Sequence, residues 1–285
     1  MAVFIGLDIG GTKFLAAAAD AQGNILRKTP RRDAPVDLQE GLALLNAMIA
    51  EAAAGEKISA IGAAIGGPMD YKTGIVSPLH QPQWRQVPLK AMMEERWHCP
   101  FTVDVDTNAA ALGEYAADPQ KPGRFLYITI STGMGGSFLL DGKLYRGMQD
   151  GHPEIAHQSI AYHCAHPQNI QCECGVPNCL EALVSGNGIR RIYGKPAEDL
   201  NETEWAEVSY NIAQGLRNLN VIYLPDGIVL GGGVAIGRGN RLIDDLQQML
   251  RDWVKIVPVS EVRLSRLGYE TALHGALVLA IQGLA

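Results

Sequence analysis

The sequence lacks three features that mark common classes of protein: a basic excess, a charged segment before its first apolar run, and an even set of spread cysteines. Its 285 residues include 24 lysines and arginines against 30 aspartates and glutamates, which gives a formal net charge of −6. This balance disfavours a nucleic-acid partner, because contacts with phosphate backbones need a basic face. The apolar run at the N-terminus follows no charged segment and is too short to cross a membrane. We therefore expect a soluble cytoplasmic protein that has no membrane partner.

Cysteine is scarce, and its distribution is not that of a secreted disulfide scaffold. The chain has five cysteines, an odd number, whereas secreted frameworks use an even number spread along the chain. Three of the five follow the spacing C-x-C-x4-C, at Cys172, Cys174 and Cys179. Clustered thiols with a histidine upstream favour a metal site over three buried thiols. Cys164, His163 and His166 are close enough in sequence to compete as ligands.

The chain also lacks any stretch typical of a linker or a low-complexity tract, and its 32 glycines concentrate in short clusters after apolar runs. Residues 4–29 and 125–147 share one order: strand, glycine turn, strand, tight turn, strand. This weak internal repeat predicts two similar α/β lobes with a cleft between them. We expect the first lobe to span 1–117 and to be completed by a C-terminal helix at about 270–285. The second lobe would span 118–269 and carry the cysteine loop.

Hydrophobic periodicity predicts further elements in each lobe. In the first lobe, residues 41–55 are expected to form an amphipathic helix, and 57–68 a buried strand that ends at glycines. Residues 101–108 are expected to form a strand that leads into a helix. In the second lobe, 204–224 have the apolar spacing of a long helix, and 227–233 follow it as a strand.

Three glycine clusters follow apolar strands: DIGGT at Asp8–Thr12, STGMGG at Ser131–Gly136 and LGGGV at Leu230–Val234. The first lies between two predicted strands, so it is not the strand-loop-helix pattern of a P-loop. A glycine turn can still aim backbone N–H groups at a phosphate, because no Cβ atom blocks the approach. Asp8, at a strand end, is placed to hold a magnesium ion through water. One such turn also suits a plain hairpin, but three of them indicate a nucleotide.

The stretch VDVDTN supplies a candidate general base. Asp104 and Asp106 alternate on one predicted strand, so we expect both to face the same side. A carboxylate at a strand end beside a helix N-terminus is placed to accept a proton from a substrate hydroxyl. The alternative is that Asp106 or Thr107 only caps the helix that follows.

The motifs occur in one order over nearly the whole chain: DIGGT, DVDTNAAALGE, STGMGG, EIAH, CECGVPNCLE and LGGGV. This combination resembles the ROK family, whose name covers repressors, unassigned reading frames and sugar kinases. The resemblance implies a duplicated actin-like ATPase (ribonuclease H-like) α/β fold, with a sugar and ATP in the interlobe cleft, and a homodimer. The ATP-binding residues that it implies are Asp8, Gly10, Gly11, Thr12, Lys13, Thr132, Gly133, Gly231, Gly232 and Gly233.

The same resemblance assigns roles to the cysteines and to polar residues near them. It implies a structural zinc ion, a closed four-ligand site, held by His157, Cys172, Cys174 and Cys179. The sugar-binding residues that it implies are Gly67, Asp106, Glu154, His157 and Glu181, with Asp106 as the catalytic base. By holding His157, the metal would also position the sugar-binding side chains around it. Without the resemblance, Glu154 would be taken as a surface carboxylate and Glu181 as a residue of a helix start.

The sequence departs from the family pattern where substrate choice is made. Ala156 occupies the glycine position of E-x-G-H, and Val105 replaces an asparagine that contacts the sugar in glucokinase-like members. GHPE (Gly151–Glu154) and YGKPAEDL (Tyr193–Leu200) look like the fructokinase branch, whereas CECGVPNCLE looks like the glucokinase branch. We therefore expect an ATP-dependent hexose kinase that favours fructose. The alternative is a glucokinase or another hexose or amino-sugar kinase.

Two other classes of function, a repressor and a non-catalytic sugar-binding module, fit the sequence less well than a kinase. A sugar-responsive repressor would carry a DNA-binding segment before the first lobe, but the first predicted strand begins within a few residues of Met1 and the net charge is acidic. A sugar-binding module without catalysis would not need Asp8, Asp106 and all three glycine turns. Both features favour the kinase.

Overall fold

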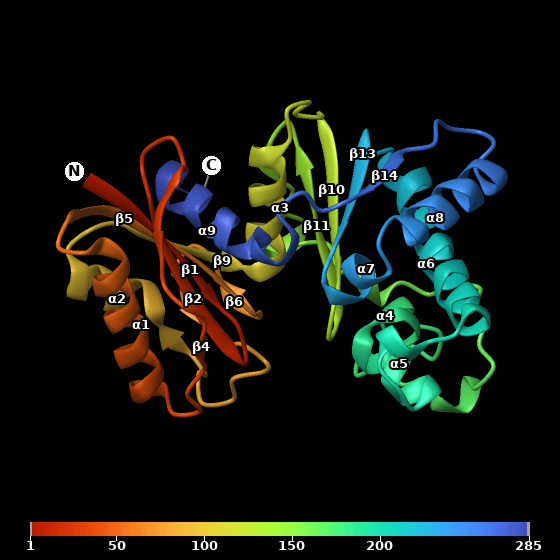
Figure 1. Cartoon of the computed structure of the whole chain (residues 1–285), viewed down its shortest axis with the longest axis horizontal. Helices are drawn as coiled ribbons and strands as arrows, with labels where there is room; N and C mark the ends of the chain where they lie inside the picture. Colours follow the sequence, from red (N-terminus) through yellow and green to blue (C-terminus); the bar gives the residue numbers. More distant parts are fainter. Residues whose placement is uncertain (1, 284–285) are drawn as a thin grey trace. The chain divides into compact units, whose positions relative to one another are not determined.

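The computed structural model describes residues 2–283, which form two compact α/β units (Figure 1). Unit 1 comprises the described residues of the segments 1–119 and 270–285, and unit 2 comprises residues 120–269. The helix expected at about 270–285 runs from Thr271 to Gln282, and the last two residues of that range lie outside the described chain. In the described chain, no helix is long and apolar enough to span a bilayer.

Unit 1 is built on a sheet whose strand order is β3-β2-β1-β5-β9, with β4 paired to β2. β1 pairs antiparallel with β2 and parallel with β5, and β5 pairs parallel with β9. The strands are β1 (Ala2–Ile9), β2 (Lys13–Ala19), β3 (Ile25–Lys28), β4 (Arg32–Asp33), β5 (Lys57–Ile65) and β9 (Phe101–Val105). A small separate sheet consists of β6 (Met69–Asp70), β7 (Ile75–Val76) and β8 (Val87–Pro88).

Unit 1 has four α-helices in the described chain, and the last of them, α9, comes from the C-terminal end of the sequence and packs against elements of the N-terminal segment. The four helices are α1 (Leu38–Ala53), α2 (Leu89–Trp97), α3 (Asp106–Ala117) and α9 (Thr271–Gln282). Figure 1 shows α9, drawn in blue, among the red and orange elements of this unit. α3 and α9 touch along their backbones, since a Cβ atom added at Gly275 would lie 1.6 Å from the carbonyl oxygen of Ala109. Only glycine at position 275 permits this approach.

Unit 2 repeats the arrangement of the first sheet. Its strand order is β12-β11-β10-β13-β14, in which β10 pairs antiparallel with β11 and parallel with β13. The strands are β10 (Arg124–Ile130), β11 (Met134–Leu140), β12 (Lys143–Leu144), β13 (Gly227–Gly231) and β14 (Glu261–Leu264). A hairpin followed by a parallel strand through a helical connection therefore occurs in both units. The repeated sequence order predicted the two hairpins, and the structure adds the parallel pairing.

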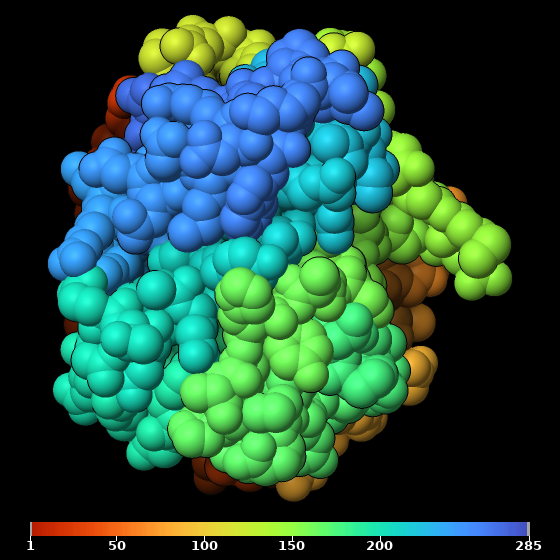
Figure 2. Space-filling model, turned by 90° about the vertical axis from the view of Figure 1, so that its right-hand side faces the viewer, coloured from red at the N-terminus to blue at the C-terminus, as the bar shows by residue number. Residues whose placement is uncertain are grey.

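Figure 2 shows one face of unit 2, with blue atoms of the segment that includes α8 in its upper part and green atoms of the segment before α4 in its lower part. The α-helices are α4 (Leu180–Val184), α5 (Gly186–Tyr193), α6 (Glu202–Tyr223), α7 (Gly233–Arg238) and α8 (Asn240–Trp253). Short 3-10 helices lie at Met148–Asp150, Ile155–His157, Pro167–Asn169, Ala197–Asp199 and, at the unit boundary, Gly268–Glu270. α6 begins with a capping box at Asn201 and Glu204 and buries its predicted apolar stripe, including Val208, Ile212 and Leu216.

Candidate functional site

Two carboxylates of unit 1 lie at the carboxyl edge of its sheet. Asp8 is the last residue but one of β1, and Asp106 begins α3 directly after β9. β1, β5 and β9 are parallel, so their carboxyl ends share one edge, where open α/β sheets bind ligands. The pKa of Asp8 is raised to about 6, first by burial of its carboxyl group and then by the charge of Asp106, while Arg31 acts in the opposite direction. The two carboxylates therefore repel each other, as groups that share a cation or a proton do.

The strand boundary at Asp106 differs from the sequence-based prediction. β9 ends at Val105, so Asp104 and Asp106 do not share a strand, and the prediction that both face one side of it is wrong. Asp104 is buried and accepts hydrogen bonds from Asn108 Nδ2 (2.9 Å) and Val105 N (2.7 Å). Asp106 is exposed, because the helical turn starts there and redirects its side chain. The N-cap position belongs to Val105, and Asp106 Oδ1 accepts a hydrogen bond from Thr107 N at 2.7 Å within the first turn of α3.

The first glycine turn joins β1 to β2. Gly10 N donates to Lys13 O at 3.0 Å, and a Cβ atom on Gly10 would lie 2.9 Å from the same oxygen, so the turn is as tight as glycine allows. Gly11 and Thr12 are exposed at its tip. Lys13, the cation predicted to act with them, forms an ion pair with Asp33 on β4.

The second glycine turn, Ser131–Met134, joins β10 to β11 in unit 2. Within it, Ser131 N donates to Gly133 O at 2.8 Å. The junction between α4 and α5 holds it from outside, since Gly186 N donates to Ser131 O (2.7 Å) and Asn187 N donates to Thr132 O (3.0 Å). The turn therefore has one defined shape, which a loop must have to present N–H groups to a phosphate.

The third glycine cluster lies against the strand that leads into the second turn. A Cβ atom on Gly231 would lie 2.3 Å from Tyr127 Oη, and one on Gly232 would lie 2.4 Å from Ile130 O. Gly232 also has φ +84°, which disfavours any residue with a side chain. Gly233 then begins α7. The fold thus brings the second and third clusters together in unit 2.

Beside these two clusters lies a cavity of about 470 Å³. Its lining includes Ser131, Thr132, Asn187, Arg190, Pro196, Ala197, Leu200, Trp205, Gly233, Val234 and Arg238. The guanidinium group of Arg238 lies 4.9 Å from the ring centre of Trp205, and Glu202 holds it by ion pairing at 2.8 Å. Trp205 and Arg238 of this wall belong to no recognised motif, and the YGKPAEDL stretch that contains Pro196, Ala197 and Leu200 gave no indication of a cavity.

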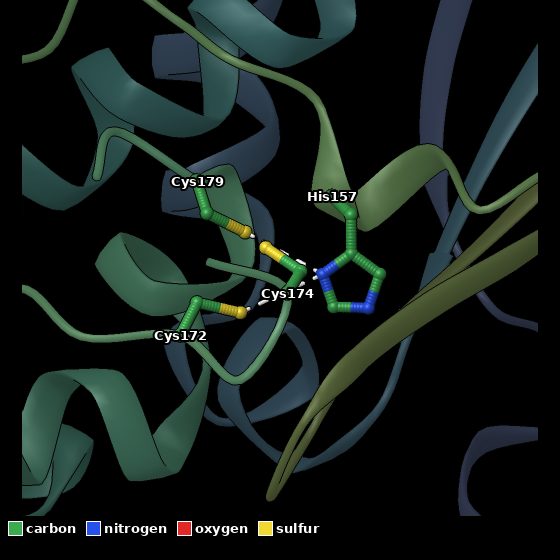
Figure 3. Close-up of side chains that lie close together, drawn as sticks. All are labelled: His157, Cys172, Cys174 and Cys179. Carbon is green, nitrogen blue, oxygen red and sulfur yellow. Dashed lines mark hydrogen bonds between the residues drawn. The ribbon is translucent and has the colours of Figure 1, made fainter. Parts of the chain in front are cut away.

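Four predicted metal ligands, the Cys₃His cluster, converge in unit 2 (Figure 3). One nitrogen or sulfur atom from each of His157, Cys172, Cys174 and Cys179 lies within 4.8 Å of all the others. The Nδ1 atom of His157 faces the thiols, 3.6 Å from Cys172 Sγ and 3.5 Å from Cys179 Sγ. Ligand atoms of a tetrahedral zinc ion, bound at about 2.3 Å, lie about 3.8 Å apart. The two distances from His157 Nδ1 are close to this value, and the donor set of three sulfurs and one imidazole nitrogen suits zinc.

The cluster is held by the chain segments around it. His157 ends a 3-10 helix, and Cys179 precedes α4 and bridges to Ser159 as in an antiparallel sheet. Burial raises the pKa of Cys172 to about 12 and also raises that of Cys179, whereas a hydrogen bond from the Val176 backbone lowers the pKa of Cys174. A metal would therefore bind with release of protons from the buried thiols.

His163, Cys164 and His166, the other candidate ligands in the sequence, lie outside the Cys₃His cluster. The ring of His163 stacks on Tyr210, with centroids 3.6 Å apart. Cys164 packs against the core of unit 2, and His166 faces the ring of Tyr193. In the part of the chain that the structure describes, the metal-binding group therefore contains only the four residues of Figure 3.

Carboxylates lie on both sides of the His157 ring. Oε2 of Glu181 is 3.3 Å from Nδ1, and Oε1 of Glu181 accepts a hydrogen bond from Met134 N, also at 3.3 Å. Oε2 of Glu154 is 4.0 Å from Nε2 of His157, and its Oε1 is 3.5 Å from His152 Nε2. The predicted sugar-binding residues of unit 2 thus form one polar group around a single imidazole.

The other two predicted sugar-binding residues, Gly67 and Asp106, belong to unit 1. The two positions that depart from the family pattern, Val105 and Ala156, are both buried. Gly67 precedes a cis peptide bond to Pro68, and a Cβ atom on Gly67 would lie 3.3 Å from Val105 Cγ1. Val105 itself is buried and apolar. Ala156, which replaces the family glycine, is fully buried and its carbonyl oxygen lies 3.6 Å from Cys179 Sγ. The structure accommodates this methyl group in the core of unit 2.

Comparison with known proteins gives consistent matches over the whole chain. A glucokinase of Streptomyces coelicolor is 28% identical over 319 residues and covers 98% of each chain. A putative fructokinase of Bacillus subtilis is 30% identical over 298 residues, which cover 98% of this chain and 95% of the relative. Among solved structures, a ROK family glucokinase from Streptomyces griseus in complex with glucose and AMPPNP has a TM-score of 0.79 at 28% identity, over 99% of this chain and 100% of that chain.

The model of the ROK family matches residues 4–283, nearly the full length of the chain. The structural similarity extends over both units and confirms the expected fold class, the actin-like ATPase fold of ROK sugar kinases. The chain therefore belongs to the ROK family.

Proposed function

We propose that the protein is an ATP-dependent hexose kinase that transfers the γ-phosphoryl group of Mg-ATP to a sugar hydroxyl. The observation that carries the proposal is the pair of interacting carboxylates, Asp8 and Asp106, at the carboxyl edge of the unit 1 sheet. Relatives named glucokinase and fructokinase, similar over nearly their whole lengths, support it. The similar structure that contains glucose and AMPPNP supports a sugar and a nucleotide as the two substrates.

Asp106 is the proposed general base. Its exposed carboxylate, in the first turn of α3, accepts the proton of the sugar hydroxyl as that oxygen attacks the γ-phosphorus. The phosphoryl group moves to the sugar, and ADP leaves. Asp8 would hold a magnesium ion through water, and the ion supplies positive charge against the phosphates. Asp8 must be ionised for this role.

The glycine turns are the proposed phosphate contacts. Gly10, Gly11 and Thr12, with Lys13 beside them, would contact the phosphates from unit 1, and Thr132 and Gly133 from unit 2. Backbone N–H groups in such turns stabilise charge on the transferred group without reorganisation.

The base and ribose would occupy the cavity of unit 2. Gly233 lines this cavity directly after Gly231 and Gly232, and the absence of a side chain on Gly233 lets a flat group approach the backbone. The apolar lining provided by Leu200 and Val234 suits an aromatic base.

Zinc is the proposed structural metal of the Cys₃His cluster. Four protein ligands would close its coordination sphere, so it would stabilise the fold and take no part in the transfer. The residues that it would position are the carboxylates on either side of His157, namely Glu154 and Glu181.

Fructose is the proposed preferred sugar, with glucose as the alternative. Val105 offers no hydrogen bond beside Gly67, and a buried hydroxyl left without a partner costs about 1–3 kcal/mol. His152 and Glu154 lie 3.5 Å apart and together provide a polar pair for a hydroxyl. Relatives of both names are similar to the chain to nearly the same degree, so they support either sugar.

The deciding experiment is an ADP-release assay with Mg-ATP over a panel of hexoses and amino sugars. ADP formation that depends on one sugar supports the kinase, and its absence with all sugars refutes it. Fructose should give the highest kcat/KM, and Val105→Asn should move the ratio towards glucose by about tenfold. A wild type that prefers glucose, or an unchanged ratio in the variant, would show that position 105 does not select the sugar.

A further inference from the structure

Glu181 connects two sites that the proposed function treats separately, the Cys₃His cluster and the Ser131–Met134 turn. Its Oε2 atom lies 3.3 Å from His157 Nδ1 and 3.7 Å from Cys172 Sγ. Its Oε1 atom accepts the hydrogen bond from Met134 N at 3.3 Å. The same oxygen would lie 2.9 Å from a Cβ atom on Gly133, so the carboxylate lies directly against the turn.

A second connection runs through the backbone on the other side of the turn. Cys179 is the residue before α4, and α4 is a single five-residue helix that is buried apart from Glu181. Its far end leads into Gly186 and Asn187, whose N–H groups donate to the carbonyl oxygens of the turn at 2.7 and 3.0 Å. A Cβ atom on Gly186 would lie 2.9 Å from Ser131 O, so the two backbone segments are in close contact here. The turn is thus held at both edges by the segment that begins at Cys179.

The nitrogen of His157 that faces the thiols is the one that faces Glu181. A metal would bind this nitrogen and the thiolate of Cys172, so Cys172 Sγ would lose the proton that it donates to Glu181 Oε2 at 3.7 Å, and Nδ1 would no longer be able to donate one. Metal occupancy therefore changes the hydrogen-bond partners of this carboxylate. Because the other oxygen of the carboxylate holds Met134 N, this change reaches the turn directly.

We propose that Glu181 is a positioning residue that links the Cys₃His cluster to the Ser131–Met134 turn, so that zinc and nucleotide phosphate bind unit 2 cooperatively. This inference rests on the proposed function, which places phosphate at the turn and zinc in the cluster. It adds a consequence for regulation: the affinity for nucleotide depends on metal occupancy. By linkage, the affinity for zinc depends on the nucleotide by the same factor.

The test is the dissociation constant of AMPPNP, measured by titration calorimetry without sugar. The wild type is used zinc-loaded, after removal of zinc by a chelator that is then dialysed away, and after reloading. We expect the metal-free protein to bind AMPPNP about fivefold more weakly or worse, and reloading to restore the affinity. The reciprocal measurement uses folded, zinc-loaded protein: competition with a chelator of known affinity should show zinc held about fivefold more tightly when AMPPNP is present.

Two variants decide whether Glu181 carries the link. In Glu181→Ala the effect of zinc on AMPPNP affinity should fall below about twofold. Glu154→Ala is the matched control, because Glu154 faces the other nitrogen of the same imidazole and lies 4.0 Å from it. This control should keep the wild-type effect of zinc.

The outcomes distinguish three hypotheses: the link between zinc and nucleotide, the role of Glu181 in it, and the proposed function. A zinc effect below about twofold in the wild type, by both measurements, overturns the link while AMPPNP binding itself stays intact. An effect that persists in Glu181→Ala, or that disappears equally in Glu154→Ala, overturns the role of Glu181. Failure of the zinc-loaded wild type to bind AMPPNP refutes the proposed function, and the link with it.

Discussion

Asp8→Asn should make the protein more stable at pH 8 while abolishing its turnover. The pKa of Asp8 is raised from 3.8 to about 6, with burial as the largest cause and the charge of Asp106 as the second. A pKa difference of about two units corresponds to at most about 3 kcal/mol of folding free energy, at 1.36 kcal/mol per unit. The asparagine side chain cannot ionise, so the variant does not lose this folding free energy at high pH.

The direction of the pH effect on stability follows from which state, folded or unfolded, binds the proton of Asp8 more tightly. The folded carboxyl group has the higher pKa, so its protonation stabilises the fold in full below pH 3.8, and this contribution is lost as pH rises through about 6. At pH 8 the wild type therefore contains a half-buried carboxylate that the charge of Asp106 repels. The gain in Asp8→Asn is expected to be about 1–3 kcal/mol, because the variant also loses the attraction between Asp8 and Arg31.

The assay is urea denaturation of both proteins at pH 8 and pH 5, without magnesium or nucleotide, which would bind and stabilise the wild type. The variant should be the more stable protein at pH 8, and its advantage should shrink at pH 5. Asp20→Asn is the control, since Asp20 is exposed and hydrogen bonds from Asn24 lower its pKa, so no gain is expected. An Asp8→Asn protein that is no more stable at pH 8, or whose advantage is the same at both pH values, would contradict this account of the site.

Three further predictions test the base, the helix contact and the metal. Asp106→Asn should lower kcat by about 10²-fold or more while the Kd for AMPPNP stays near the wild-type value, and near-normal turnover would remove Asp106 from the mechanism. Gly275→Ala should lose at least about 3 kcal/mol of stability, because its Cβ atom would lie 1.6 Å from Ala109 O. Gly227→Ala is the control and should melt near the wild-type temperature, because no atom lies within 4 Å of its new methyl group. The wild type should contain about one zinc ion per chain by elemental analysis, and Cys174→Ser should lose it; an active wild type without zinc would disprove the proposed metal.

The order of elements was predictable because it depends on local patterns. Apolar runs interrupted by glycine predicted both hairpins, and the 3.6-residue spacing predicted α6 together with its buried face. The motif order predicted the ROK family and its fold class, and the comparisons confirm both. The roles of the individual site residues, the homodimer and the cellular location stay predictions.

The boundary at Asp106 shows where local pattern fails. Alternation along a strand and the first turn of a helix both suit the sequence VDVDT, and the choice between them depends on where the sheet ends. The structure ends β9 one residue earlier than the alternation requires. This single step separates a buried Asp104, bonded to Asn108, from an exposed Asp106.

The sequence by itself determined the composition of the sites, since residue type and spacing decide which chemistry is available. Thiols at Cys172, Cys174 and Cys179, glycines after strands and a carboxylate before a helix are all visible in one dimension. Only the tertiary structure decided which groups meet. It brought His157, and not the nearer His163, to the thiols, and it placed Glu181 between the cluster and the Ser131–Met134 turn. Such contacts join residues tens of positions apart, and packing of the whole unit, which no local pattern encodes, sets their geometry.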